Sequence, residues 1–71
     1  MIRDELFSAC EFYHKRATTV HIKIDSELFY NGIIIQLDEK MMILQERMLG
    51  ETIIFLKDIK SIEPYKERKN E

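Results

Sequence analysis

Few side chains in this sequence have the types and spacing that catalysis requires. An active site needs a nucleophile within reach of a base, or paired carboxylates in a cleft. The carboxylates here are spread over predicted turns and a helix surface, and Ser8, Ser26 and Ser61 have no evident histidine partner. There is no glycine-rich phosphate loop. The sequence therefore predicts a protein that is not an enzyme.

Cofactor and metal chemistry are equally unsupported. Two histidines and one cysteine make a poor set of metal ligands, so neither a metal site nor another cofactor is expected. A single cysteine cannot form an intramolecular disulfide, and Cys10 is predicted to be a small buried residue.

The length and composition predict one small globular domain that associates with itself. The chain has 71 residues, of which 45% are hydrophobic and 34% charged, with a net charge of −2. A domain this small buries only about 60% of the surface that its unfolded chain exposes. Without a disulfide or metal, self-association is the remaining source of stability. No basic block is present, so any site for an anion must be local.

The start of the chain and its hydropathy bear on its location. The first residues include Asp4 and Glu5 and no signal-peptide core. No apolar run is long enough to cross a bilayer. We therefore expect a cytoplasmic protein with no membrane partner.

The pattern of apolar residues predicts one helix followed by five short strands. Residues 3–16 form an amphipathic helix, whose apolar stripe consists of Leu6, Ala9, Cys10, Tyr13 and Ala17. The period then changes to two, which is typical of half-buried antiparallel strands. The strands are expected at residues 18–25, 28–37, 41–46, 52–57 and 59–63. The domain spans residues 1–65, and residues 66–71 form a charged, disordered tail.

The dipeptide Asn31-Gly32 has two interpretations. Asn-Gly is a strong hairpin signal, but a turn there leaves a strand of only three residues before it, Leu28–Tyr30. A glycine inside a strand instead marks a bend where another backbone passes closely. We favour the bent strand, which lets five short strands close into a small barrel with few exposed edges.

These elements resemble the Sm and LSm superfamily, and in particular its Hfq branch. The segments Val20–Ile24, Phe29–Ile33 and Asp38–Leu44 are similar to the first Sm motif, in which a bent strand with glycine leads to an aspartate and an apolar strand. The segment Phe55–Pro64 is similar to the second motif. The resemblance implies a mainly β fold with one N-terminal helix, built as a strongly bent five-stranded antiparallel sheet that forms a small open barrel of the SH3-like type.

The resemblance also implies a ring of six or seven subunits. In this family the fourth strand of one subunit pairs with the fifth strand of the next, which here are residues 52–57 and 59–63. The residues implied at the subunit interface are Ile53, Ile54, Phe55, Ile59 and Ile62. The family binds single-stranded RNA, often U-rich around the pore and A-rich on the opposite face.

Three groups of residues occupy the positions that bind RNA in the family. The pore-side group is Asp38, Lys40, Phe55 and Lys57; the opposite-face group is Lys23, Phe29 and Tyr30; the rim group is His14, Lys15 and Arg16. Each has an alternative, structural interpretation. Asp38 can bond backbone N–H groups in a turn, Phe29 and Tyr30 can be core, and the basic residues can complement the helix dipole.

The pore-side positions depart from the family pattern. Lys40 stands where the family has an aromatic or histidine ring, and Met42 stands where Sm proteins read uracil with an asparagine. The Lys-His pair of the Hfq branch is replaced by Leu56-Lys57. The leading hypothesis is a homo-oligomeric ring that binds U- or A-rich single-stranded RNA as a chaperone or scaffold. The alternative is an Sm-like assembly module that binds other proteins and has lost base-specific RNA binding.

Overall fold

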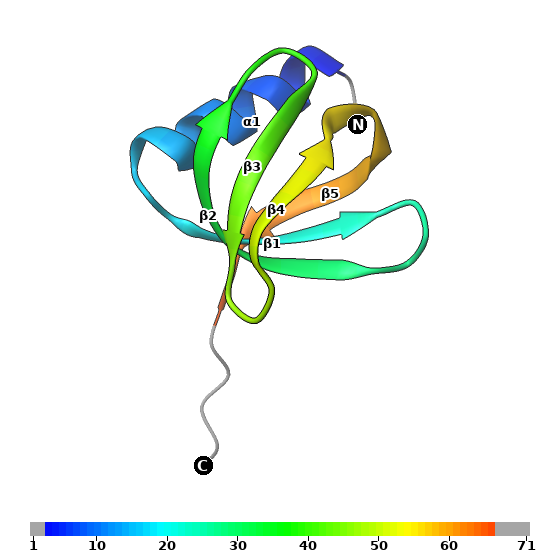
Figure 1. The fold of residues 1–71 in the computed structure, drawn as a ribbon. Helices are drawn as coiled ribbons and strands as arrows, with labels where there is room; N and C mark the ends of the chain where they lie inside the picture. Colours follow the sequence, from blue (N-terminus) through cyan, green and yellow to red (C-terminus); the bar gives the residue numbers. More distant parts are fainter. Residues whose placement is uncertain (1–2, 67–71) are drawn as a thin grey trace.

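A computed structural model describes residues 3–66, which form one helix and five strands (Figure 1). The elements are α1 (Arg3–Lys15), β1 (Thr19–Ile24), β2 (Phe29–Leu37), β3 (Met41–Glu46), β4 (Gly50–Phe55), the 3₁₀ turn η1 (Leu56–Asp58) and β5 (Ile59–Pro64). The predicted order of one helix and five strands is confirmed. Most of the predicted tail, residues 67–71, lies outside the described residues.

Helix α1 ends where the chain turns into the sheet. Ala17 has a φ of 51°, and its N–H donates to the carbonyl of His14 at 3.2 Å. The N–H of Thr18 donates to the carbonyl of Tyr13 at 3.1 Å, which satisfies a second carbonyl at the helix end. The predicted apolar stripe is therefore wrong at Ala17, which is exposed beyond the helix because the left-handed turn removes it from the helical face.

The strands form one antiparallel sheet in the order β4-β3-β2-β1-β5. Strand β2 runs through Asn31-Gly32 without a turn, so the bent strand is confirmed over the hairpin. At the bend, Gly32 pairs with Val20 of β1 and with Glu46 of β3. A Cβ at Gly32 would lie 2.1 Å from the carbonyl oxygen of Gln45. The close approach of β3 therefore requires glycine at this position.

The bounds of β4 differ from the prediction by two residues at each end, and those of β1, β2 and β5 differ by at most one residue. Strand β4 begins at Gly50 rather than residue 52, because Gly50 has a φ of +81° and can pair with Glu46 directly after the turn. It ends at Phe55, since Leu56 donates its N–H to the carbonyl of Lys40 and starts η1. Strand β5 extends to Pro64, which is tolerated because β5 lies at the edge of the sheet.

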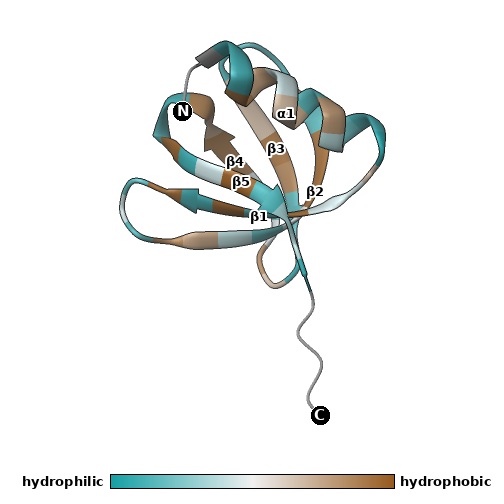
Figure 2. Cartoon of the chain, turned by 180° about the vertical axis from the view of Figure 1, so that it is seen from behind, coloured by the Kyte–Doolittle hydropathy of each residue, from teal (hydrophilic) through white to brown (hydrophobic). Residues whose placement is uncertain are grey.

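The core lies between α1 and the concave side of the bent sheet. Its buried members are Leu6, Cys10, Val20, Ile22, Ile34, Met42, Leu44, Ile54, Leu56, Ile59 and Ile62. Figure 2 shows hydrophobic segments alternating with hydrophilic ones along the strands, next to the helix. Cys10 is fully buried, as predicted, and burial raises the pKa of its thiol to about 11.

Among residues 3–66, no helix has both the length and the hydropathy to cross a membrane.

Candidate nucleic-acid interface

Lys40 and Lys57, together with Phe55, line one hollow of about 510 Å³ on the helix side of the barrel. Its complete lining is Leu6, Glu39, Lys40, Phe55, Leu56, Lys57 and Ile59. The loop after β2 meets the turn after β4 because the N–H of Leu56 donates to the carbonyl of Lys40 at 2.9 Å. Two lysines 17 positions apart in the sequence (57 − 40 = 17) thus line the same hollow within one chain. We call this site the lysine hollow.

Asp38 shapes the loop that presents Lys40. Its Oδ1 atom accepts the backbone N–H groups of Lys40 at 2.8 Å and Met41 at 2.9 Å. These bonds, the one from Lys40 first, lower the pKa of the Asp38 carboxyl group. Asp38 is not among the residues that line the lysine hollow. The geometry is that of the turn-forming aspartate that the sequence also allowed.

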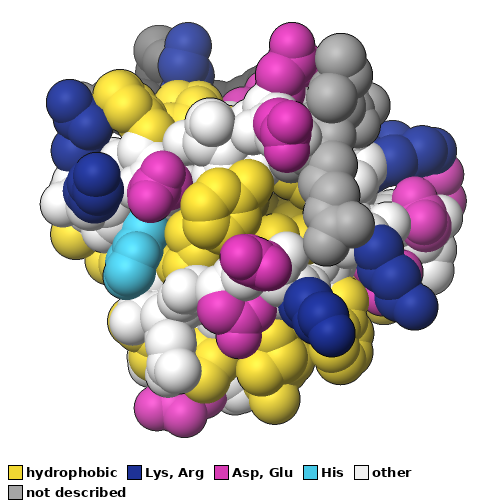
Figure 3. Space-filling model, turned by 90° about the horizontal axis from the view of Figure 1, so that it is seen from above, with side chains coloured by type: hydrophobic (Ala, Val, Ile, Leu, Met, Phe, Trp, Pro, Cys, Tyr) yellow, Lys and Arg dark blue, Asp and Glu magenta, His cyan; other side chains and the backbone are white. Residues whose placement is uncertain are grey.

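The surface of the helix side mixes both signs of charge. Figure 3 shows acidic and basic side chains interspersed around hydrophobic side chains that reach the surface. Within the lysine hollow the same mixture occurs, because the exposed Glu39 lies beside the two lysines. Glu39 was missed in the sequence, where an acidic residue next to Asp38 in a turn gives no signal of its own.

A stacked pair of rings lies on the β1–β2 hairpin, which projects away from α1 (Figure 1). Phe29 is 52% exposed, and its ring stacks on that of His21 with the centroids 4.8 Å apart and the planes at 20°. The Nζ atom of Lys23 lies 5.7 Å from the centroid of Phe29, its cross-strand partner. His21 thus supports Phe29 from one side. We call His21, Lys23 and Phe29 the hairpin platform.

Tyr30 and Glu27, which lie near the hairpin platform, both make contacts within the fold. Tyr30 is half-buried and packs against the core, as its place in the alternating strand predicts. Lys23 and Lys60 both bind the carboxylate of Glu27, at 3.3 Å and 3.4 Å. Hydrogen bonds from Lys23 and then Lys60 lower the pKa of Glu27. Lys23 is therefore shared between an ion pair and the ring of Phe29.

The rim group lies where α1 ends. His14 and Lys15 occupy the last turn of the helix, and Arg16 follows it. The guanidinium carbon of Arg16 lies 3.9 Å from the ring centroid of Phe12, which is 50% exposed. The basic residues suit the negative end of the helix dipole, and the Arg16–Phe12 contact orders one of them on the surface.

The residues implied at a subunit interface divide into two sets. Ile54, Ile59 and Ile62 point into the core of their own chain and are at most 8% exposed. Ile53 and Phe55 point outward from β4 and are 57% and 48% exposed. Because side chains alternate along a strand, only the outward set offers side chains to a neighbour. The backbones of β4 and β5 form the two edges of the sheet.

Glu46 is a buried carboxylate that sequence reasoning missed. It is 6% exposed, and its oxygens accept the backbone N–H groups of Asn31 at 3.0 Å, Met48 at 2.7 Å and Leu49 at 2.9 Å. These bonds, the one from Asn31 first, lower its pKa. The alternation along β3 could have predicted that Glu46 is buried, because Glu46 shares the inward face of this strand with Met42 and Leu44. The bonds fix the β3–β4 turn and so the start of the edge strand β4.

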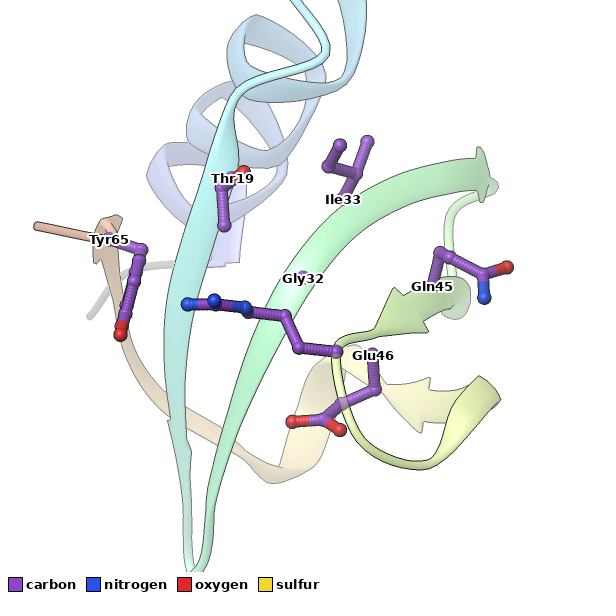
Figure 4. Close-up of a pocket in the computed structure, with 7 residues that line it drawn as sticks. Thr19, Gly32, Ile33, Gln45, Glu46 and Tyr65 are labelled. Atoms are coloured by element: carbon purple, nitrogen blue, oxygen red, sulfur yellow. The ribbon is translucent and has the colours of Figure 1, made fainter. Parts of the chain in front are cut away.

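A second hollow, of about 550 Å³, lies at the bend of β2 and is lined by Thr19, Gly32, Ile33, Gln45, Glu46, Arg47 and Tyr65. Figure 4 shows Tyr65 on one side of it and Gln45 and Glu46 on the other, with Gly32 between them. The Arg47 guanidinium carbon lies 5.1 Å from the ring centroid of Tyr65, and the Tyr65 N–H donates to the carbonyl of Thr19 at 2.8 Å. These contacts extend the pairing of β5 with β1 by one residue and hold Tyr65 against the sheet.

Within residues 3–66, no three His, Cys, Asp or Glu side chains gather where they could hold a metal ion.

Comparison with known proteins identifies the fold. No protein-family model matches the sequence, and no curated protein matches it. The structure is similar to a crystal structure of Hfq, described as a pleiotropic translational regulator, with a TM-score of 0.70, 18% identity, and coverage of 78% of this chain and 90% of that one. It is also similar to an Hfq protein from Anabaena sp., with a TM-score of 0.69, 21% identity, and coverage of 82% and 92%.

The chain therefore has an Sm-like fold, with an N-terminal helix followed by five antiparallel strands in one sheet. Within that class, its structural neighbours place the fold near the Hfq branch. The resemblance seen in the sequence is thus confirmed for the fold.

Proposed function

We propose that this chain is one subunit of a homo-oligomeric Sm-like ring of six or seven members that binds single-stranded RNA in the cytoplasm as a chaperone or scaffold. The observation that carries the proposal is the lysine hollow, where Lys40, Lys57 and Phe55 meet beside the edge strand β4. Two cations and an exposed aromatic ring are the groups that contact the backbone and bases of a single strand.

The edges of the sheet support a ring. Strands β4 and β5 lie at opposite ends of the strand order, and each leaves backbone N–H and C=O groups unpaired on one side within the described chain. Ile53 and Phe55 add exposed apolar side chains to β4. Pairing β4 of one subunit with β5 of the next would satisfy both edges, and such a head-to-tail contact, repeated, forms a ring when its rotation closes. It would also add the burial that a small domain lacks.

Ring symmetry would repeat a weak RNA-binding site and so raise the overall affinity for RNA. Each subunit would contribute Lys40 and Lys57, so a near-neutral chain could still present a local array of cations. Successive nucleotides could then bind successive subunits, with avidity in place of deep pockets. In this arrangement Asp38 acts indirectly, by holding the loop that carries Lys40.

The other two groups would extend the RNA path. On the opposite face, Phe29 presents a ring for base stacking, and Lys23 lies beside it. Tyr30 would support this surface from its half-buried position. On the rim, His14, Lys15 and Arg16 would contact phosphate. The family resemblance implies U-rich RNA on the pore side and A-rich RNA on the opposite face.

Light scattering and RNA titration test the proposal. The mass should be several times that of one chain, and labelled oligouridine and oligoadenosine should bind with an affinity that falls as salt rises. Lys40→Ala and Lys57→Ala should weaken oligouridine binding. Lys66→Ala is the matched control, because Lys66 is exposed and lines neither hollow. A monomer would contradict the ring, and an intact ring that binds neither RNA at low salt would contradict RNA binding.

A second candidate function is supported by the β3–β4 turn. Met48 is 88% exposed and Leu49 is 67% exposed at its tip, while their N–H groups are fixed by Glu46. A rigid apolar tip is suited to contact with another protein. An Sm-like assembly module would show an intact ring, no RNA binding, and loss of partner binding on Met48→Ser.

A further inference from the structure

The lysine hollow contains a carboxylate that phosphate binding does not explain. Glu39 lines it together with Lys40 and Lys57. A negative charge in a site for RNA opposes the phosphate backbone, so it needs another role or weakens the site. In the neighbouring Asp38 the carboxylate is engaged by the backbone N–H groups of the turn. Within residues 3–66, the carboxylate of Glu39 has no such hydrogen bond and no ion pair.

The place of Glu39 is fixed although its carboxylate is not engaged. Its backbone lies inside the turn that Asp38 closes onto Lys40 and Met41. The floor of the hollow is rigid and apolar, because Leu6, Leu56 and Ile59 are buried in the core. The aromatic side chain of Phe55 is half-exposed and lines the same hollow. Glu39 and Phe55 border the same hollow, so a base that stacks on Phe55 would share this hollow with the Glu39 side chain.

The chemistry of a carboxylate selects among the bases. An ionised carboxylate only accepts hydrogen bonds. Guanine presents two adjacent donors on its Watson–Crick edge, N1–H and the N2 amino group, which match the two oxygens of a carboxylate. Uracil has one donor between two carbonyl oxygens, which the carboxylate repels. Adenine and cytosine each have one amino group beside a ring nitrogen lone pair.

We infer that the lysine hollow prefers guanine, with Glu39 as the specificity-determining residue. Phe55 stacks on the base, Glu39 accepts the N1–H and N2–H bonds of guanine, and Lys40 and Lys57 contact the adjoining phosphates. The inference rests on the proposed RNA-binding function and names its preferred base. It differs from the U-rich preference that the family resemblance implies, because the side chains in this hollow include a carboxylate.

Titration of the assembled protein with matched oligonucleotides tests the inference. The probes are a labelled oligouridine and the same strand with one central residue changed to guanosine, inosine or adenosine. Inosine keeps N1–H but lacks the N2 amino group. We expect the guanosine strand to bind about tenfold more tightly than the adenosine strand, as one bidentate base contact allows. The inosine strand should fall between them.

Variants separate base reading from charge. Glu39→Gln keeps the shape of the side chain but replaces one acceptor oxygen with an NH₂ donor, so the preference for guanosine should disappear. Its general affinity should rise, because a negative charge is lost. Glu11→Gln removes an exposed carboxylate from α1 outside the lysine hollow, and it should leave the guanosine preference unchanged.

The outcomes distinguish this inference from the function on which it rests. Equal binding of the four strands, or a guanosine preference that survives in Glu39→Gln, overturns the role of Glu39 and leaves RNA binding intact. A ring that binds none of the strands at low salt overturns both. Guanosine preference that is lost in Glu39→Gln and kept in Glu11→Gln supports both.

Discussion

Replacing Glu46 by glutamine should destabilise the protein although the shape of the side chain is kept. In the structure, one oxygen of Glu46 accepts the N–H groups of Met48 and Leu49, and the other accepts the N–H of Asn31. Glutamine has one acceptor oxygen. If that oxygen keeps the two bonds to the turn, the NH₂ group faces the N–H of Asn31, donor against donor.

The magnitude follows from the bonds lost. One part-buried backbone donor is left unsatisfied, which costs about 1–3 kcal/mol, and two bonds to a charged acceptor become bonds to a neutral one. We expect Glu46→Gln to lower the free energy of unfolding by about 2 kcal/mol. Glu46→Ala, which leaves three donors without their acceptor, should cost more.

Urea denaturation followed by circular dichroism measures this loss. Wild type, Glu46→Gln and the control Glu51→Gln must be compared at one protein concentration, because the proposed self-association would contribute to apparent stability. Glu51 is an exposed carboxylate on β4 of the same hairpin, and its replacement should change stability by less than about 0.5 kcal/mol. Equal stability of the two variants would refute the role that we assign to Glu46.

The pH dependence gives an independent test. The pKa of Glu46 is lowered in the folded protein, so its contribution is fully present above its unfolded pKa of about 4.3. The contribution is lost as pH falls from there through the folded pKa. Wild type should therefore lose its advantage over Glu46→Gln in that acidic range. A stability difference that stays constant through it would contradict the linkage.

Three further predictions concern the bend, the core and the loop. Gly32→Ala should unfold the domain or cost more than about 3 kcal/mol, because the added Cβ would lie 2.1 Å from the carbonyl oxygen of Gln45; a normal melting temperature would contradict this. Cys10 should resist a thiol reagent at pH 8 in the native state and react after denaturation, because it is fully buried with a pKa of about 11. Asp38→Asn should retain most of the stability, because one oxygen accepts both backbone N–H groups, whereas Asp38→Ala should lower the urea midpoint, because both N–H groups lose their acceptor; equal midpoints for the two variants would refute the turn role.

Local patterns were sufficient for the elements and for most of the core. The change from a helical to a two-residue period predicted where α1 gives way to β1, and alternation predicted that Val20 and Ile22 are buried. The bend at Gly32 was also predictable, because a glycine within an apolar strand implies close approach of another backbone. These features depend on residues that are neighbours in the sequence.

The candidate site could be predicted only in outline. Lys40, Lys57 and Phe55 were selected from a family resemblance, and the structure places all three at the lysine hollow. Neither Glu39 nor the support of Phe29 by His21 could be read from spacing. Glu39 could be assigned to the site only from the fold, which places it beside two lysines that are distant from each other in the sequence. His21 could be assigned to the site only from the strand register, which places its ring beside that of Phe29.

By itself, the sequence determined a small helix-plus-barrel domain, its buried faces and its bend, because each follows from the period of apolar residues along a short segment. The tertiary structure decided which polar side chains meet. It set Glu46 against three backbone N–H groups, moved the start of β4 to Gly50, and joined Lys40 to η1 through the N–H of Leu56. Such pairings depend on strand register and on contacts between distant segments, which the folded chain fixes and a local pattern does not contain.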